Sequence, residues 1–247
     1  MTKKIFWENP YLVELQANVT SVMGSDITVD QTIFFAESGG QESDHGFMNN
    51  HRVLKAFKAS KEIIYTLDAD HGLKADDRVK MVIDWERRYK LMRYHFAAEV
   101  ILELVYQKWP GIEKIGAHIA QDKARIDFIW GQNISRIFPE LDQEASKIIA
   151  ANQTIESAFS DAEAEKRYWK IEGFSQVACG GTHLRNTGEI GQISLKRNNI
   201  GKGKERIEIF IVSTQPSRPE SGSISESKEK VPFGTDIDFN PSTESAG

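Results

Sequence analysis

WERRYKLMRYHFAAEVILELVYQKW, residues 85–109, carries apolar residues at the spacing of one helix face. Asp84 stands directly before it as an N-cap, and Glu86 lies in the first turn. Pro110-Gly111 follows it, and proline cannot continue a helix. The pattern therefore predicts one long helix between Asp84 and Pro110.

The residues before this helix predict β structure. Short runs of β-branched and aromatic residues alternate with clusters of Gly, Asp, Asn and Ser. The predicted strands are Tyr11–Val13, Ile27–Val29, Thr32–Phe35, Arg52–Phe57 and Glu62–Leu67. Strands this short favour a small barrel or sandwich, so we expect residues 1–84 to form a small β-barrel domain.

The residues after the helix mix both kinds of element. Ala124–Trp130 alternates like a half-buried strand, and further strands are expected near Arg167–Ile171, Gly191–Lys196 and Arg206–Val212. A second helix is expected from Pro139 to about Glu165, with its core face made by Leu141, Ala145, Ile148, Ile149, Ile155 and Phe159. The fold class is therefore α+β, with residues 85–213 as an α/β two-layer domain.

The last residues, 214–247, differ in composition. They are rich in proline and serine, and their apolar residues are isolated. Such a segment cannot bury enough apolar surface to offset its ordering entropy. We expect a disordered, flexible tail, in which only Val231–Phe239 has the composition to dock elsewhere.

Composition excludes several functional classes. The chain has 247 residues, 40% hydrophobic and 27% charged, like an ordinary globular protein. No apolar run is long enough to cross a membrane, and no secretory signal begins the chain, so we expect a cytoplasmic protein without a membrane partner. The one cysteine, Cys179, allows no internal disulfide. The net charge of −5 gives no global attraction for nucleic acid, so an RNA partner would need a local basic patch.

Two pairs of residues could bind a metal ion. In Cys179-Gly-Gly-Thr-His183, two glycines allow a thiolate and an imidazole to face one point, and both are preferred zinc ligands. The alternative is a buried cysteine and a surface histidine in a turn. His95 and Glu99 are four residues apart on one helix face, which also describes an ordinary polar pair. Together the two pairs would supply four zinc ligands.

Other signals are weaker. The glycines of Ser38-Gly-Gly-Gln41 allow a close approach of the backbone to a ligand, although a polar turn has the same composition. His45, His51, His71 and His118 have no partner at metal-ligand spacing, and no nucleotide-binding pattern follows a strand. Two basic clusters would suit an RNA backbone. They consist of Arg87, Arg88, Lys90 and Arg93, and of Lys196, Arg197, Lys202, Lys204 and Arg206.

Four segments in order carry a resemblance: FFAESGGQESDHG (34–46), WERRYKLMRYHFAAE (85–99), KARIDF (123–128) and CGGTHLRNTGEIG (179–191). The chain resembles the editing part of alanyl-tRNA synthetase and its free-standing relatives, the AlaX proteins, over residues 30–212. It is similar to the medium-length AlaX type, in which a glycine-motif β domain precedes a zinc-binding editing domain. We expect no aminoacylation domain and no ATP site, because the domain would need several hundred more residues and no nucleotide-binding pattern is present.

The resemblance implies a set of site residues. Zinc ligands of the family match His95, Cys179 and His183, whereas Glu99 stands where the family usually has histidine. Glu99 could ligate the ion, act as a base, or mark an empty site. Gln41 and Thr32 match catalytic positions, with Thr32 as the sensor of the substrate hydroxyl, and Gly39 and Gly40 match substrate-binding positions. The expected tRNA-binding residues are Arg93, Lys196, Arg197, Lys202 and Lys204.

The resemblance implies a trans-editing hydrolase that binds the acceptor end of mischarged alanine tRNA. It would cleave the ester of serine, with glycine as a second candidate, in a zinc-dependent reaction. A nucleophilic Cys179 is a less favoured mechanism, because its neighbouring histidine lacks an orienting third group. Two other functions remain open: a tRNA-binding protein with decayed editing chemistry, and an editing hydrolase for a different amino acid.

Overall fold

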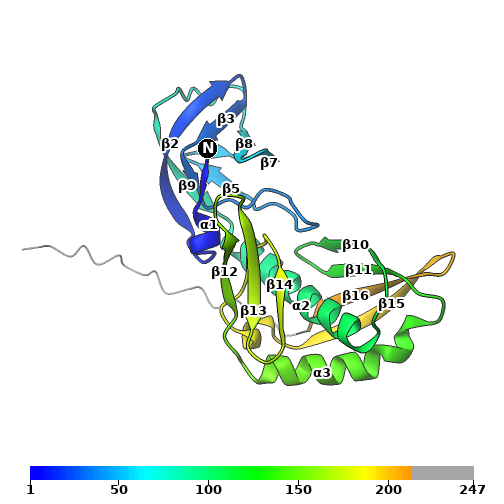
Figure 1. The fold of residues 1–247 in the computed structure, drawn as a ribbon. Coiled ribbons are helices and arrows are strands. Elements are labelled where there is room, and N and C mark those ends of the chain that lie inside the picture. Colours follow the sequence, from blue (N-terminus) through cyan, green and yellow to red (C-terminus); the bar gives the residue numbers. More distant parts are fainter. Residues whose placement is uncertain (213–247) are drawn as a thin grey trace, which may run out of the picture.

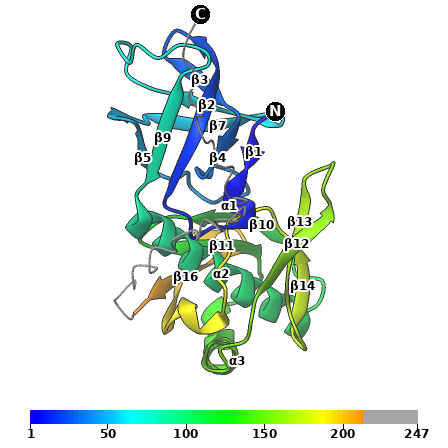
Figure 2. The ribbon, with the colours of Figure 1, turned by 90° about the vertical axis from the view of Figure 1, so that its left-hand side faces the viewer.

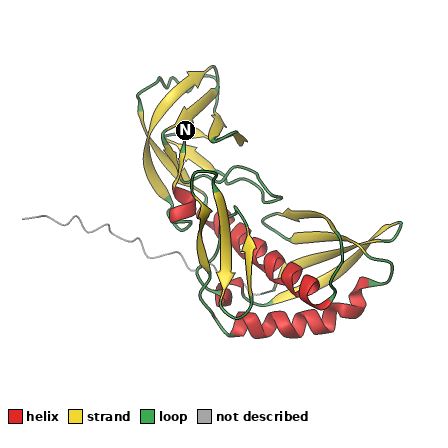
Figure 3. Cartoon of the chain, in the orientation of Figure 1, coloured by secondary structure: helices red, strands yellow, loops and turns green. Residues whose placement is uncertain are grey.

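The computed structural model describes residues 1–212, and most of its secondary structure is strand (Figure 1). We call residues 1–84 the first half of the structure and residues 85–212 the second half. The two long helices, α2 (Trp85–Lys108) and α3 (Phe138–Ala150), both belong to the second half (Figure 3). No helix among the described residues is long and apolar enough to cross a membrane. The predicted tail, with Val231–Phe239, lies outside the described residues.

The residues before α2 form a seven-stranded antiparallel sheet in the order β6-β5-β9-β2-β3-β8-β7. Its strands are β2 (Glu14–Met23), β3 (Asp26–Val29), β5 (Gly46–Met48), β6 (His51–Arg52), β7 (Lys55–Ala59), β8 (Glu62–Thr66) and β9 (Arg78–Ile83). A parallel pair, β1 (Lys3–Lys4) with β4 (Gln31–Thr32), and the one-turn helix α1 (Ile5–Glu8) complete this half. Figure 2 shows α1 at the junction with the second half.

We expected a small β-barrel, and the strands form a sheet that closes only in part, as a half-barrel. Its edge strands β6 and β7 form no ladder with each other. The chain itself crosses between the two edges, where the amide of Val53 bonds to Gly46 O and that of Leu54 bonds to Thr66 O. The predicted strand Arg52–Phe57 is therefore divided at this crossing. The division of the chain at residue 84 stays a prediction.

Two predicted strands are wrong because side chains take the backbone groups that a ladder would use. Of Thr32–Phe35, only Thr32 lies in a strand; the carbonyl of Ile33 accepts from Arg88 and the amide of Phe35 donates to Asp44. Tyr11–Val13 precedes β2, and the Tyr11 amide donates to the side chain of Asn9 at 3.1 Å.

The long helix is confirmed as α2, Trp85–Lys108. The Asp84 side chain accepts a hydrogen bond from the Arg87 amide at 3.1 Å, as an N-cap does. Fifteen residues of α2 are buried on several of its faces, because other elements pack around it. The helix is therefore a central element that can hold a buried polar side chain in a fixed place.

A second sheet packs against α2. Its antiparallel order is β10 (Lys114–Ile119), β11 (Ala124–Ile129), β16 (Lys204–Ile211) and β15 (Ile193–Gly201). Alternate residues of its central strands, such as Phe128 and Ile207, are buried beside α2 and α3. A three-stranded sheet of β12 (Glu156–Asp161), β13 (Lys166–Ile171) and β14 (Ser175–Ala178) lies beside α2 (Figure 1). Trp169 on β13 contacts Phe96 on α2, with ring centres 5.2 Å apart. Two short 3-10 turns, η1 (Ile134–Ile137) and η2 (Thr187–Ile190), complete this half.

The second helix is shorter than expected. α3 spans Phe138–Ala150, and the residues predicted as its last turns form β12. Asn152 adopts a left-handed conformation, with φ of 46°, which ends the helix. Ile155 is nevertheless buried. Its spacing fitted the predicted helix, but it lies in the connection between α3 and β12.

The two halves are joined by buried polar contacts. Arg88 on α2 and Asp44 form an ion pair in which neither side chain is exposed. The guanidinium also donates to the carbonyls of Ile33 and Pro10, at 2.5 and 2.8 Å. At the far end of the β12–β13 hairpin, Lys4 pairs with Glu165. These contacts fix the loop before β5 against the start of α2.

We expect Asp44→Asn to lower the free energy of unfolding by about 3 kcal/mol or more, because it leaves the Arg88 charge buried without its partner. Urea unfolding followed by tryptophan fluorescence measures this. Lys90→Ala, which breaks the exposed Lys90–Glu86 pair, is the control and should change stability by less than about 0.5 kcal/mol. Equal costs for the two variants would contradict a special role for the buried pair.

Candidate active site

Three side chains from α2 and the loop after β14 converge on one point. The ligand atoms of His95, Cys179 and His183 all lie within 4.8 Å of one another. Cys179 Sγ is 3.2 Å from His95 Nε2 and 3.3 Å from His183 Nε2. Both histidines are buried, and the cysteine is half-buried. The structure thus brings together residues that are 84 positions apart in sequence.

This donor set fits zinc. Typical Zn–S and Zn–N bond lengths place the nitrogen and sulfur atoms of a tetrahedral site about 3.6 Å apart. The two measured separations are a few tenths of an ångström shorter, so small side-chain movements would accommodate the ion. Thiolate and imidazole are also the ligand types that zinc prefers.

Glu99 borders this group without belonging to it. Its Oε1 atom lies 3.4 Å from His95 Nε2 and 3.6 Å from Cys179 Sγ. Its other oxygen, Oε2, accepts a hydrogen bond from the Trp169 indole at 3.1 Å. Burial raises the pKa of this carboxyl, but the hydrogen bond and charge of His95, with Trp169 and Cys179, outweigh burial and lower it. Glu99 therefore presents an ionised oxygen to the group.

The two imidazoles differ in their charge states. Burial lowers the pKa of both. For His95, the Cys179 and Glu99 side chains outweigh burial and raise its pKa to about 10. For His183, the positive charges of His95 and Arg167 add to burial and hold its pKa well below the ordinary value. His183 is therefore neutral at pH 7, and a cation binding here would displace a proton from His95.

The backbone of the loop 179–183 is fitted to His95. A Cβ atom at Gly181 would lie 2.3 Å from His95 Cε1, so any side chain at this position would displace the imidazole. The neighbouring carbonyls accept from the first half of the chain and from β13: Gly180 O from the Trp7 indole at 2.8 Å, and Gly181 O from Arg167 at 3.3 Å. The glycine is thus required for close packing of loop and helix.

Ser157 on β12 orients His183. Its hydroxyl oxygen is 2.8 Å from His183 Nδ1. A hydrogen on Nδ1 that is donated to Ser157 leaves the Nε2 lone pair facing Cys179, which is the arrangement of a supported metal ligand. His95 Nδ1, in contrast, is buried without a hydrogen-bond partner among the described residues.

Gln41 contacts the loop from the other side. Its Nε2 donates to the Thr182 hydroxyl at 2.9 Å, and its Oε1 accepts from the Thr182 amide at 3.4 Å. Both residues are buried. The predicted catalytic glutamine therefore lies beside His95, Cys179 and His183, the candidate metal-binding group. Its amide is bonded to Thr182, the residue that precedes His183.

Gly39 and Gly40 shape the turn that carries Gln41. Gly40 has φ of 86°, and a Cβ atom there would lie 2.7 Å from Ala117 O. The turn is bonded to the edge of β10, where the Ile119 amide donates to Gly40 O at 2.7 Å. The need for a glycine at position 40 is thus explained by packing, whereas Gly39 has open space around it and a φ of 61°. Contact of either glycine with a substrate stays a prediction.

Thr32 is enclosed in the first half of the chain. Its hydroxyl oxygen accepts from Tyr65 at 2.5 Å and from the Phe34 amide at 2.9 Å, and its side chain is buried. Only its own O–H remains for a further bond. A sensing role would require the substrate to reach a buried side chain, and it stays a prediction.

The basic residues are distributed unevenly. Lys196, Lys202 and Lys204 are exposed and form no ion pair within the described residues. Arg197 pairs with Glu205. Arg93 is buried, with its Nε donating to Ile190 O. The positive charge of the cluster on the β15–β16 hairpin (Lys196, Arg197, Lys202, Lys204 and Arg206) is therefore partly neutralised.

The cluster at the start of α2 forms no exposed basic surface. Arg87 pairs with Glu42, and Arg88 is buried with Asp44. Among the other histidines, His118 lies 3.2 Å from Glu42 and His71 bonds to Gly24 O, so both have structural contacts.

Sequence reasoning missed Ser157, Thr182 and Arg167. Thr182 lies within the segment Cys179–His183, so its position next to a predicted zinc ligand could have indicated a role in the site. Ser157 was concealed by its assignment to a helix, and nothing in the sequence links Arg167 to the loop that it bonds.

Comparisons with known proteins agree with this geometry. The family described as the threonyl and alanyl tRNA synthetase second additional domain matches residues 167–208. The alanyl-tRNA editing protein AlaX-M of Pyrococcus horikoshii is 30% identical over 85% of this chain and 98% of its own length. That of Methanosarcina mazei is 34% identical over 84% and 95%. The alanine–tRNA ligase of Methanococcus aeolicus is 31% identical over 84% of this chain and 25% of its own length. The chain belongs to the AlaX-M family of alanyl-tRNA editing proteins.

Proposed function

We propose that this protein hydrolyses the ester of mischarged alanine tRNA, with serine as the amino acid removed and glycine as a second candidate. Its family makes it an aminoacyl-tRNA deacylase, which is a hydrolase. The observation that carries the proposal is the convergence of His95, Cys179 and His183. A cytoplasmic location, where charged tRNA is used, is part of the same proposal.

Zinc is the proposed cofactor, held by these three residues with Glu99 as the fourth ligand. When bound, the ion would polarise a water or substrate oxygen beside the ester. An aminoacyl ester is already activated, so positioning is a large part of what the protein must supply. Glu99 fits a ligand better than a free base, because the Trp169 indole holds one carboxylate oxygen while the other faces His95 and Cys179.

Neighbouring residues maintain this arrangement. Gln41 and Thr182 hold the loop that carries His183, so we assign Gln41 to positioning. Ser157 fixes the His183 ring, which keeps Nε2 directed at the group. These contacts come from both halves of the chain, which makes the relation between the halves part of the site.

The acceptor end of tRNA is the proposed partner. The exposed Lys196, Lys202 and Lys204, with Arg197 beside them, would contact its phosphates. Arg93, which was also predicted to bind tRNA, does not belong to this surface because it is buried. Such contacts would make tRNA binding weaken as salt concentration rises.

Two features are compatible with other functions. Glu99 replaces the histidine usual in the family, which suits a protein with decayed chemistry that binds tRNA and little zinc. The engaged hydroxyl of Thr32 suits a hydrolase for another amino acid. The first predicts no deacylation of any charged tRNA. The second predicts that the protein binds zinc and removes a different amino acid but does not remove serine.

Elemental analysis of the purified protein tests the metal site. We expect about one zinc ion per chain and a loss of most of it in Cys179→Ala, because the thiolate faces both imidazoles. Glu99→Ala should weaken zinc binding by about tenfold or more, whereas Glu99→His should retain it. His118→Ala, at an exposed histidine, is the control and should keep its zinc. Unchanged affinity in Glu99→Ala would exclude Glu99 as a ligand.

Release of serine from mischarged alanine tRNA tests the reaction. Cys179→Ala should lose at least about a hundredfold in rate while its circular dichroism stays that of the wild type, because removing the thiolate removes a metal ligand. A panel of alanine tRNAs charged with serine, glycine and alanine should show the fastest release for serine. Wild-type turnover in Cys179→Ala, or no cleavage of any ester by the zinc-loaded protein, would contradict the proposal.

A further inference from the structure

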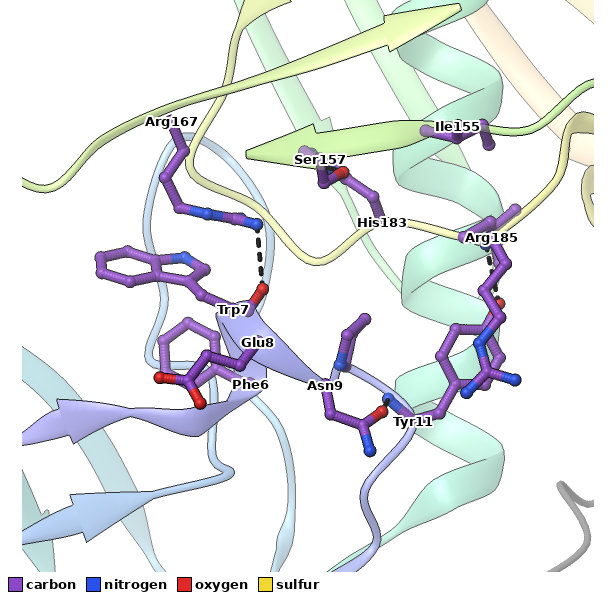
Figure 4. A pocket seen from close by; sticks show the side chains of 12 residues that line it. Phe6, Trp7, Glu8, Asn9, Tyr11, Ile155, Ser157, Arg167, His183 and Arg185 are labelled. Atoms are coloured by element: carbon purple, nitrogen blue, oxygen red, sulfur yellow. Dashed lines mark hydrogen bonds between the residues drawn. The ribbon is translucent and has the colours of Figure 1, made fainter. Parts of the chain in front are cut away.

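A hollow of about 410 Å³ opens between α1 and the β12–β13 hairpin (Figure 4). Trp7, Asn9 and Tyr11 line it from the first half of the chain, and Ser157 and His183 line it from the second. His183 thus lines the hollow while its Nε2 lies 3.3 Å from Cys179 Sγ in the metal-binding group, and its Nδ1 is bonded to Ser157, which also lines the hollow. The hollow lies one imidazole ring away from the proposed site of ester cleavage.

One wall of this hollow is a cation–π pair of Arg185 and Tyr11. The Arg185 guanidinium lies 4.1 Å from the centre of the Tyr11 ring. Arg185 is exposed, and its side chain forms no hydrogen bond or ion pair within the described residues. The Tyr11 ring is held in place because its hydroxyl donates to Glu189 at 2.6 Å. A fixed aromatic ring covered by a guanidinium with unused donors offers a stacking surface and hydrogen bonds together.

The opposite wall contains a second arginine with an unused donor. Arg167 is only 5% exposed, and its Nη2 donates to Trp7 O at 3.0 Å. Its guanidinium carbon lies 5.6 Å from the centre of the Trp7 ring and 5.3 Å from that of Phe159, and these two rings contact each other edge to face. The Nε of Arg167 is buried and has no partner among the described residues. A buried donor of this kind costs free energy unless a water or a ligand satisfies it.

We propose that this hollow binds the 3′-terminal nucleoside of the aminoacyl-tRNA, with its base against the Tyr11–Arg185 pair. Proteins bind unpaired RNA bases by stacking them on aromatic rings and guanidinium planes. The amino-acid ester is attached to the ribose of that nucleoside, so its base must lie within one sugar of the site of cleavage. The inference rests on the proposed deacylase function and names where its substrate is held.

The chain offers a matched control. A second hollow, of about 590 Å³, is lined by Trp109, Trp130 and Arg136 beyond the C-terminal end of α2. It also combines aromatic rings with an arginine, but none of its lining residues contacts the metal-binding group. Any general affinity of such hollows for nucleosides would therefore appear at both places.

Binding of the trinucleotide CCA, which carries no ester, tests the assignment by calorimetry on the full chain. We expect the wild type to bind CCA more tightly than the dinucleotide CC, which lacks the terminal adenosine. Arg185→Ala should weaken CCA binding by about tenfold. Arg185→Lys should weaken it similarly, because lysine keeps the charge but has no planar group. Arg136→Ala should bind as the wild type does.

Equal binding of CCA and CC, undiminished binding in Arg185→Ala, or a loss in Arg136→Ala would overturn this assignment. Circular dichroism of Arg185→Ala, whose changed side chain is exposed, checks that the variant is folded. The result is separable from the hydrolase proposal. CCA binding that depends on Arg185 would support the nucleoside site even in a protein that cleaves no ester, whereas cleavage with CCA binding independent of Arg185 would leave the hydrolase and remove this site.

Discussion

The buried ion pair between Arg88 and Asp44 holds together the parts on which the site depends. Its guanidinium bonds to the Asp44 carboxylate and to the carbonyls of Ile33 and Pro10, which belong to separate segments of the first half. Arg88 precedes His95 by seven residues, about two turns of α2, so the two side chains leave nearly the same face of one helix. The helix that supplies the proposed metal ligand His95 therefore also fixes the loop that carries Gln41.

A charged pair in this position favours one arrangement more than it adds stability. Removing two charges from water costs much of what their attraction returns, so apolar residues could hold the halves together equally well. An apolar contact would tolerate sliding, whereas the guanidinium must meet Asp44 and two carbonyls in fixed directions. The turn at Gly40 adds a second constraint through its bond to Ile119 on β10. Gln41 is thus held from two sides where it meets Thr182.

The sequence was informative where a residue's role is local. Asp84 caps α2 as predicted, because an N-cap needs only its own turn. The convergence of His95 with Cys179 and His183 could be expected from a family likeness but from no spacing rule. Predictions failed where distant groups compete for the backbone. Ile33 and Phe35 have the composition of a strand, but their carbonyl and amide bond to Arg88 and Asp44. Ile155 continues a helical pattern by coincidence, since a left-handed Asn152 ends α3 first.

The carboxylate at position 99 changes the electrostatics of the proposed zinc site in a way that its surroundings partly offset. A thiolate and a carboxylate together would neutralise a divalent ion and weaken its pull on an oxygen. Two neighbours act in the opposite direction. The Trp169 indole donates to Glu99 Oε2 and withdraws part of its charge from the group. The buried Arg167, bonded to Gly181 O, contributes positive potential at His183 and Cys179. An ion held by Glu99 would therefore retain more Lewis acidity than its ligand charges alone imply, which is why a glutamate at this position is compatible with hydrolysis.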